Sequence, residues 1–122
     1  MFSMDPLYRE IILENWQHPQ NYGIIEDANF AVEESNPLCG DEIHLSGKIH
    51  EGKLIDIAFT GEGCAISKAS ASLFTEDIKG KSLQKIKKIK SQDVLGLLEI
   101  SLTPARTKCA LLVYSAFKKL QV

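Results

Sequence analysis

Apolar residues alternate with polar ones in the middle of the chain and recur at helical spacing on either side. Between Ile43 and Phe59 the alternation is typical of strands with one buried face. Glu51-Gly52 interrupts it and predicts a turn, so this segment is expected to form an antiparallel hairpin. The apolar residues of the returning strand, Ile55 included, are expected to face the core. Residues 31–35 are predicted to add a third strand.

Helices are predicted where apolar residues recur every three or four positions. Asp5-Pro6 supplies a start and His18-Pro19 an end for the first helix, with Tyr8 and Trp16 in the core. Gly80 is expected to follow the end of the second. The predicted helices cover residues 5–16, 66–78, 82–89 and 92–98, and a last one runs from about residue 106. Strands followed by helices indicate an α+β fold, a small three-stranded antiparallel sheet with helices packed on one face.

Length and composition fit one folded domain. The chain has 122 residues, of which 44% are hydrophobic and 25% charged, as in ordinary globular proteins. A chain of this size buries about two-thirds of its unfolded surface, which is enough for a core without disulfides or metal. Residues 1–122 are therefore predicted to form a single domain.

Charge and hydropathy argue against two classes of partner. The formal net charge of −2 does not fit a nucleic-acid-binding domain, which is usually basic. No apolar run approaches the roughly 20 residues that span a bilayer. The first residues also lack the basic and apolar regions of a signal peptide. We therefore expect a cytoplasmic protein that binds neither nucleic acid nor membrane.

Each of the three cysteines lies where one predicted element gives way to another. Cys39 lies in a turn rich in Asn, Pro and Gly, Cys64 lies between strand and helix, and Cys109 lies in the first turn of the last helix. An odd number of thiols in a reducing cytosol favours metal ligands or nucleophiles over disulfides. The alternative is that each cysteine simply packs in the core, as buried cysteines commonly do.

The surroundings of these thiols favour the thiolate, which is the form that binds metal and attacks sulfur. A helix N-terminus stabilises an anion, and both Cys64 and Cys109 are expected to benefit from one. Arg106 and Lys108 add positive charge beside Cys109. Glycines at positions 40, 61 and 63 remove side-chain bulk, either for the approach of a cluster or partner or for tight turns.

Asp41 is a fourth candidate ligand. On an extended segment, residues i and i+2 project to the same side, so Asp41 and Cys39 can face one ion. Three thiolates and a carboxylate suit a four-coordinate zinc or iron site, in which the oxygen is the harder and less committed ligand. The spacing of the cysteines alone matches no short metal motif, since the chain has no Cys-x-x-Cys pair.

Four segments together resemble the IscU/SufU/NifU-N family of iron–sulfur cluster assembly scaffolds. They occur in the family's order, at compatible spacing, over nearly the whole chain. The matching segments are His18-Pro19-Gln20-Asn21-Tyr22-Gly23, Asn36-Pro37-Leu38-Cys39-Gly40-Asp41, Gly61-Glu62-Gly63-Cys64-Ala65-Ile66-Ser67 and Arg106-Thr107-Lys108-Cys109.

The resemblance implies a SufE/NifU-like fold in which the three cysteine loops converge at one end. It implies that Cys39, Asp41, Cys64 and Cys109 hold a labile [2Fe–2S] cluster or Zn²⁺. It also implies a cysteine desulfurase that delivers persulfide sulfur, and downstream acceptors of the cluster or the sulfur. Such a protein is a scaffold rather than a conventional enzyme.

Two features of the sequence bear on whether the chain resembles the IscU or the SufU branch of the family. IscU proteins have a histidine before the third cysteine, where this chain has Lys108, and residues 102–106 differ from the segment that the IscU chaperone reads. The Arg-x-Lys-Cys and Gly-Cys-Ala-Ile-Ser sequences resemble the SufU branch, although the chain is too short for the usual SufU insertion. We therefore expect a cluster scaffold, with a SufU-type zinc-dependent sulfurtransferase as the alternative. A purely structural zinc site is a third interpretation.

Individual residues are given expected roles on the same basis. Cys39, on the loop richest in turn residues, is the expected first sulfur acceptor. Lys108 is expected to stay outside the coordination sphere, because an ammonium must lose its proton before it binds metal, and to support a thiolate or persulfide. The three histidines and the lysine-rich run over residues 79–90 are expected to be solvated surface.

Overall fold

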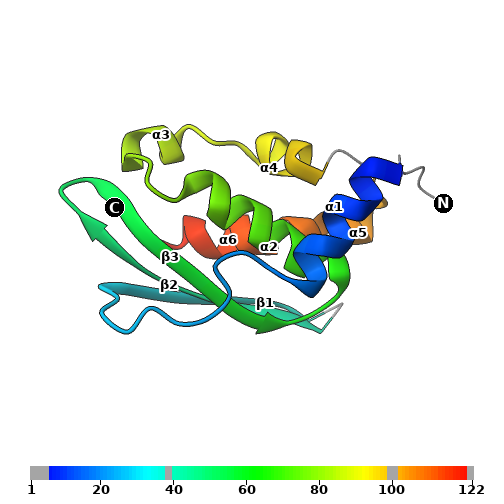
Figure 1. The fold of residues 1–122 in the computed structure, drawn as a ribbon, viewed down its shortest axis with the longest axis horizontal. Coiled ribbons are helices and arrows are strands. Elements are labelled where there is room, and N and C mark those ends of the chain that lie inside the picture. The colour runs from blue at the N-terminus through cyan, green and yellow to red at the C-terminus, as the bar shows by residue number, and fades with distance from the viewer. Residues whose placement is uncertain (1–5, 38–39, 99–101, 121–122) are drawn as a thin grey trace.

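The computed structural model describes residues 6–37, 40–98 and 102–120 (Figure 1). Three strands form one antiparallel sheet in the order β1-β2-β3. The strands are β1 (Phe30–Asn36), β2 (Asp41–His50) and β3 (Lys53–Glu62). The helices are α1 (Pro6–Gln17), α2 (Ala65–Ile78), α3 (Leu83–Lys87), α4 (Ser91–Leu98), α5 (Pro104–Ala110) and α6 (Leu112–Lys118). The predicted α+β class and the three-stranded antiparallel sheet are confirmed.

The main core lies between the sheet and helices α2 and α6. β2 alternates as predicted, so that Ile43 and Leu45 are buried while Glu42 and His44 are exposed. α2 packs on β3, and α6 packs on β1 and β2. The largest buried side chains include those of Phe59, Phe74, Leu45, Leu54, Ile57 and Ile78. Removal of this apolar surface from water is the main driving force for the fold.

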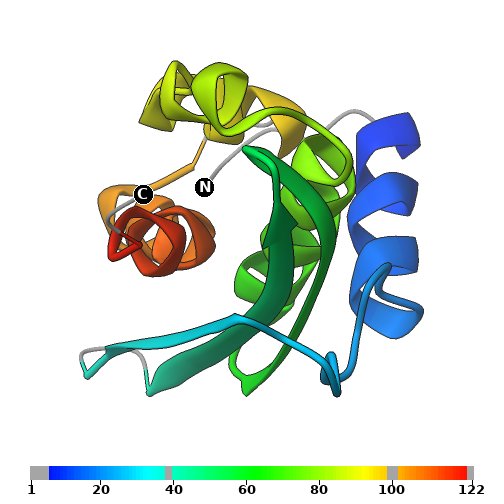
Figure 2. The same cartoon turned by 90° about the vertical axis from the view of Figure 1, so that its left-hand side faces the viewer.

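A bulge in β3 reverses the direction of its side chains. In the register, Lys48 pairs with Asp56 and Ile49 pairs with Leu54, which leaves Ile55 as an extra residue. Leu54 is consequently buried and Ile55 is exposed. The prediction that Ile55 faces the core is wrong, because one extra residue in a strand shifts the alternation to the other face. Figure 2 shows the far end of the β2–β3 hairpin bent upward beside the helices.

The bulge leads to a prediction from two chemically identical substitutions. Ile57→Val removes a methyl group from the core and is expected to lower the free energy of unfolding by about 0.5–1.5 kcal/mol. Ile55→Val removes the same group from an exposed position and is expected to change it by less than about 0.5 kcal/mol. Urea unfolding of both variants checks this, and equal losses would contradict the register described here.

The outer edge of β3 is paired with segments that come from elsewhere in the chain. Phe59 exchanges backbone hydrogen bonds with Asn21 and Gly23, at 2.9 and 2.8 Å. Leu54 exchanges two more with the turn at residues 80–81, at 3.0 and 2.7 Å. The side of β3 that faces away from β2 is therefore covered near both of its ends.

The last predicted helix is two helices. α5 begins at Pro104, with the Thr103 hydroxyl accepting the Arg106 N–H at 3.3 Å, and it ends before Leu111, whose φ of −92° and ψ of 1° interrupt the chain's helical path. α6 then continues to Lys118. The predicted start near Arg106 is too late, because Thr-Pro is itself a cap followed by a first-turn proline.

α1 packs against α2 and α4 rather than against the sheet. Ile12 is buried in these contacts, but Trp16 is 40% exposed, so the prediction of a core tryptophan is wrong. A helix that touches other helices along one narrow stripe leaves its large side chains partly in water. The side chain of Tyr8 lies outside the described residues.

The remaining predicted elements are found close to their predicted bounds. Gly80 has a φ of 85° directly after the last residues of α2, as a glycine that ends a helix commonly does. The side chains of His18, His44 and His50 are exposed, as expected. Among the described residues no helix combines the length and apolar character needed to span a bilayer.

Candidate metal centre

Three of the four predicted ligands meet at one end of the molecule. Asp41 is the first residue of β2, Cys64 is the residue directly before α2, and Cys109 lies on α5. One ligand atom from each lies within 4.8 Å of the other two. These elements come together at the right-hand end of Figure 1. The fourth predicted ligand, Cys39, lies outside the described residues.

Asp41 joins the strand to the helix as well as facing the site. Its carboxylate is 2% exposed, and Oδ1 accepts the backbone N–H of Cys64 at 3.0 Å. The second oxygen, Oδ2, lies 3.9 Å from the Cys64 sulfur, which donates to it. A carboxylate at the start of a helix also interacts favourably with the helix dipole. One oxygen thus fixes the loop while the other faces the thiol.

Two glycines allow this close approach. A Cβ on Gly63 would lie 2.6 Å from Oδ1 of Asp41, and a Cβ on Gly61 would collide with the backbone carbonyl of Glu42. Neither position has room for a side chain, because the chain's own carboxylate and backbone already fill the space. The glycines at 61 and 63 therefore serve the packing of the loop against β2, which is neither the approach of a cluster or partner nor the tight turn that was expected.

Cys64 and Cys109 differ in their relation to the helices. Cys64 is the N-cap residue of the fourteen-residue α2, with a φ of −73° and a ψ of 167°, so the predicted position at a helix N-terminus is confirmed. Cys109 is buried and lies in the last turn of α5. The prediction that Cys109 lies in a first turn is wrong, since the helix begins earlier than expected. Stabilisation by a helix N-terminus therefore applies to Cys64 alone.

Cys109 also packs in a second apolar cluster. The cluster joins α1, α2, α4 and α5, and its buried members are Ile12, Ile66, Ala69, Leu98, Cys109 and Ala110. The sulfur therefore has apolar side chains on one side and the Asp41 carboxylate and the Cys64 sulfur on the other. Low-dielectric surroundings of this kind strengthen the interaction of a thiolate with a cation.

The donor set fits a metal. A tetrahedral zinc with Zn–S bonds of about 2.3 Å would place two sulfur ligands about 3.8 Å apart. Ligand atoms within 4.8 Å of one another therefore need only a small contraction to reach that arrangement. Two thiolates and one carboxylate leave a fourth coordination position for another donor. Borderline metals such as zinc and iron suit a mixed set of sulfur and oxygen ligands.

The two predicted basic residues flank the site on its α5 side. Arg106 and Lys108 are both exposed. Lys108 lines a surface groove together with Asn36 and Pro37, the described end of the first ligand loop. Its side chain is thus near the segment that carries Cys39, which is the place where a supporting cation would be needed.

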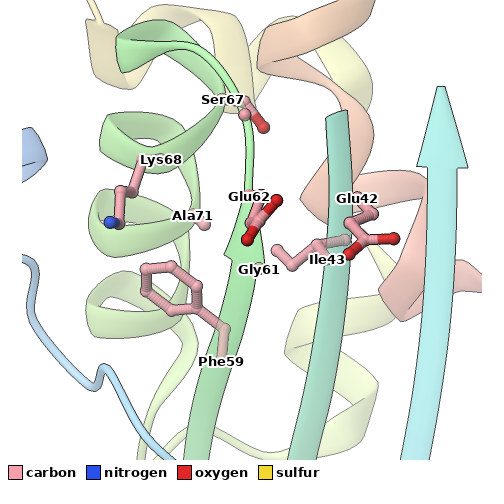
Figure 3. Close-up of a pocket in the computed structure, with 9 residues that line it drawn as sticks. Glu42, Ile43, Phe59, Gly61, Glu62, Ser67, Lys68 and Ala71 are labelled. Carbon is pink, nitrogen blue, oxygen red and sulfur yellow. The ribbon is translucent and has the colours of Figure 1, made fainter. Parts of the chain in front are cut away.

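A pair of carboxylates that the sequence motifs did not indicate lies next to the candidate ligands along β2 and β3. Glu42 and Glu62 are direct cross-strand partners, and both are exposed. Figure 3 shows both side chains beside a small pocket, with Lys68 directed away from them. Like charges in this arrangement cost stability, so the pair favours a cation or basic group nearby. The signal in the sequence was that each lies within two residues of a candidate ligand.

Comparison with known proteins identifies relatives over nearly the whole chain. The NifU-like N terminal domain model matches residues 7–120. The zinc-dependent sulfurtransferase SufU of Bacillus subtilis is 37% identical over 134 aligned positions, which cover 96% of this chain and 90% of that protein. The iron–sulfur cluster assembly scaffold protein IscU of Escherichia coli K12 is 34% identical over 115 positions, which cover 91% and 88%.

A solved structure shows the same fold. The crystal structure of SufU from Fervidobacterium islandicum, described as a scaffold protein of the SUF system, has a TM-score of 0.79 and 28% sequence identity. The match covers 90% of this chain and 93% of that one. The resemblance inferred from the cysteine motifs is confirmed by the family model and by the sequence relatives. The chain belongs to the family of NifU-like N-terminal domains, whose members include IscU and SufU.

Proposed function

We propose that this protein is an iron–sulfur cluster assembly scaffold that acts as one NifU N-terminal-like domain. It holds a labile [2Fe–2S] cluster as cargo on Cys39, Asp41, Cys64 and Cys109. The observation that carries the proposal is the convergence of Asp41, Cys64 and Cys109, whose ligand atoms lie within 4.8 Å of one another although they come from three separate elements.

The carboxylate explains why the cargo would be released. Oδ1 of Asp41 accepts a hydrogen bond from the Cys64 N–H, so only Oδ2, which faces the Cys64 thiol, is left for the metal. An oxygen ligand is also harder than a thiolate and binds a cluster less firmly. A site with one such ligand suits transfer rather than long-term electron transport.

Sulfur reaches the site from a cysteine desulfurase in this proposal. A cysteine thiolate of this protein, with Cys39 as the first acceptor, attacks the outer sulfur of the desulfurase persulfide. A new S–S bond forms on Cys39, the S–S bond on the desulfurase breaks, and the desulfurase thiolate leaves. Lys108 supports the charge on Cys39, since it lines the groove that also includes Pro37. The persulfide would become cluster sulfide by taking two electrons from an external reductant, such as a thiol, with ferrous iron supplied to the site. Downstream proteins would then take the cluster, and the reducing cytoplasm would keep the thiols available.

The second candidate function is that of a zinc-dependent sulfurtransferase. The similarity to the Bacillus SufU favours it, as does Lys108 in place of the histidine that IscU proteins have. The scaffold is preferred because a carboxylate among the ligands, Asp41, suits a cluster that is bound and then released.

Anaerobic reconstitution with ferrous iron and sulfide tests the proposal. The wild-type protein is expected to develop visible charge-transfer bands, and Cys39→Ser, Cys64→Ser and Cys109→Ser are each expected to reduce the absorbance by more than about 10-fold. Zinc that iron does not displace, together with stimulation of desulfurase turnover, would instead support the sulfurtransferase. If the metal can be removed with no change in stability or in desulfurase activation, neither function holds.

A further inference from the structure

A buried serine on α2 holds the backbone next to Cys109. Ser70 is 1% exposed, and its hydroxyl donates to the carbonyl of Ala110 at 2.5 Å. Ala110 directly follows Cys109 and is the last residue of α5. The hydrogen bond therefore connects the middle of α2 with the end of the helix that carries the third candidate ligand.

The position of this hydrogen bond matters because α5 is short and interrupted. Leu111 is bonded to the backbone of both helices, but its φ and ψ break the regular pattern between α5 and α6. The Ala110 carbonyl lies directly before this break. Carbonyl groups at the end of a helix lack their usual partners and need another donor. The Ser70 hydroxyl supplies one, and it fixes where the end of α5 lies against α2.

The same helix also sets the position of Cys64. Cys64 precedes α2, and Ser70 lies six residues further along, which corresponds to about 9 Å of helix at about 1.5 Å per residue. One rigid helix thus carries one candidate ligand at its start and holds the backbone of another through a side chain. A shift of Ala110 relative to Ser70 would change the separation between the Cys109 and Cys64 sulfurs.

A second buried serine on α2 has the same chemistry but faces elsewhere. Ser72 is 0% exposed. Its hydroxyl donates to the side-chain oxygen of Asn15 at 2.6 Å and accepts the backbone N–H of Gln20 at 2.7 Å. It therefore secures α1 and the segment after it rather than α5. Ser72 is a matched control for the loss of a buried hydroxyl.

We propose that Ser70 is a positioning residue for the metal centre, acting through the Ala110 carbonyl to hold Cys109 at coordinating distance from Cys64 and Asp41. This inference rests on the proposed assignment of Cys109 as a ligand. Outer groups that orient the ligands of a metal typically change metal affinity by 10- to 100-fold when they are removed. Ser70 is expected to belong to this class, although it is bonded to the backbone beside the ligand and not to the ligand itself.

The experiment compares Ser70→Ala, Ser70→Thr and Ser72→Ala. Zinc affinity is measured by competition with a chromophoric chelator, and bound Co²⁺ serves as a spectroscopic probe of the coordination geometry. Ser70→Ala is expected to weaken zinc binding by about 10-fold or more and to change the Co²⁺ ligand-field bands. Ser72→Ala is expected to keep zinc affinity within about 2-fold and the bands unchanged. Ser70→Thr keeps the hydroxyl and is expected to restore most of the affinity.

Stability is controlled separately, because metal affinity falls when the metal-free protein unfolds. Each substitution is therefore also made together with Gly96→Ala, which is expected to stabilise α4 and so to keep the metal-free protein folded. Gly96 is a helical position at which an added Cβ meets nothing within 4 Å. Equal affinity losses in Ser70→Ala and Ser72→Ala would overturn the inference, as would unchanged Co²⁺ bands in Ser70→Ala. If the wild-type protein binds neither zinc nor Co²⁺, the proposed function itself fails. That result differs from the two outcomes that would overturn only the role of Ser70.

Discussion

Gly63→Ala is expected to damage both the fold and the metal centre. The new Cβ would lie 2.6 Å from Oδ1 and 2.9 Å from Cγ of Asp41. Asp41 has little room to move, because it is buried and bonded to the N–H of Cys64. Overpacking and loss of that hydrogen bond together are expected to cost about 2–4 kcal/mol of unfolding free energy. Zinc affinity is expected to fall by about 10-fold or more.

Urea unfolding and zinc competition measure the two effects of Gly63→Ala. Gly96→Ala is the matched control, since it adds the same methyl group to a helix with open space around it. That control is expected to raise the free energy of unfolding by about 0.5–1 kcal/mol and to leave zinc affinity unchanged. If Gly63→Ala proves as well tolerated as Gly96→Ala, the close approach of Asp41 to this loop is not present in solution.

Asp41→Ala is expected to have opposite effects on the empty protein and on the loaded one. The empty protein loses the acceptor of a buried hydrogen bond from Cys64, which costs about 1–3 kcal/mol. The reconstituted cluster is expected to persist several-fold longer, because the hard oxygen ligand, which holds a cluster less firmly than a thiolate does, is gone. If the substitution lowers the free energy of unfolding but lengthens the lifetime of the bound cluster, Asp41 is the ligand that makes the cluster easy to release.

Asp41→Asn separates these two effects. Its amide oxygen can still accept the Cys64 N–H, so the free energy of unfolding is expected to stay within about 1 kcal/mol of the wild-type value. The amide has no negative charge and is a weaker ligand, so the cluster is again expected to last longer. Decay of the visible absorbance under a chelator measures its lifetime. Unchanged or faster decay in both variants would rule out the releasing role.

Much of the fold could be predicted because its strands and helices have regular hydrophobic patterns. β2 alternates without interruption, and the helical spacing around Phe74 places one face of α2 in the core. The candidate site could be predicted because its residues lie in short segments with Gly and Pro, which are distinctive when they occur together. The family's motifs supplied the expectation that these segments meet.

The errors arise where the local pattern does not contain the deciding information. The bulge at Ile55 depends on how β3 pairs with β2, and alternation within one strand does not reveal it. The exposure of Trp16 depends on which elements α1 touches. The hydrogen bond from Ser70 to Ala110 joins residues 40 positions apart, so only the folded arrangement shows it.

The covered edge of β3 has a consequence for how copies of this protein behave toward one another. An uncovered edge strand offers unpaired backbone groups on which another chain can add a strand and begin to aggregate. Here residues 21–23 and 80–81 occupy that side of β3. At the other edge, the Lys119 ammonium donates to the backbone carbonyl of Glu33 on β1 at 2.9 Å. The β3 edge is therefore less available for intermolecular strand pairing, and at the β1 edge a lysine occupies one of the carbonyl groups that another chain would need.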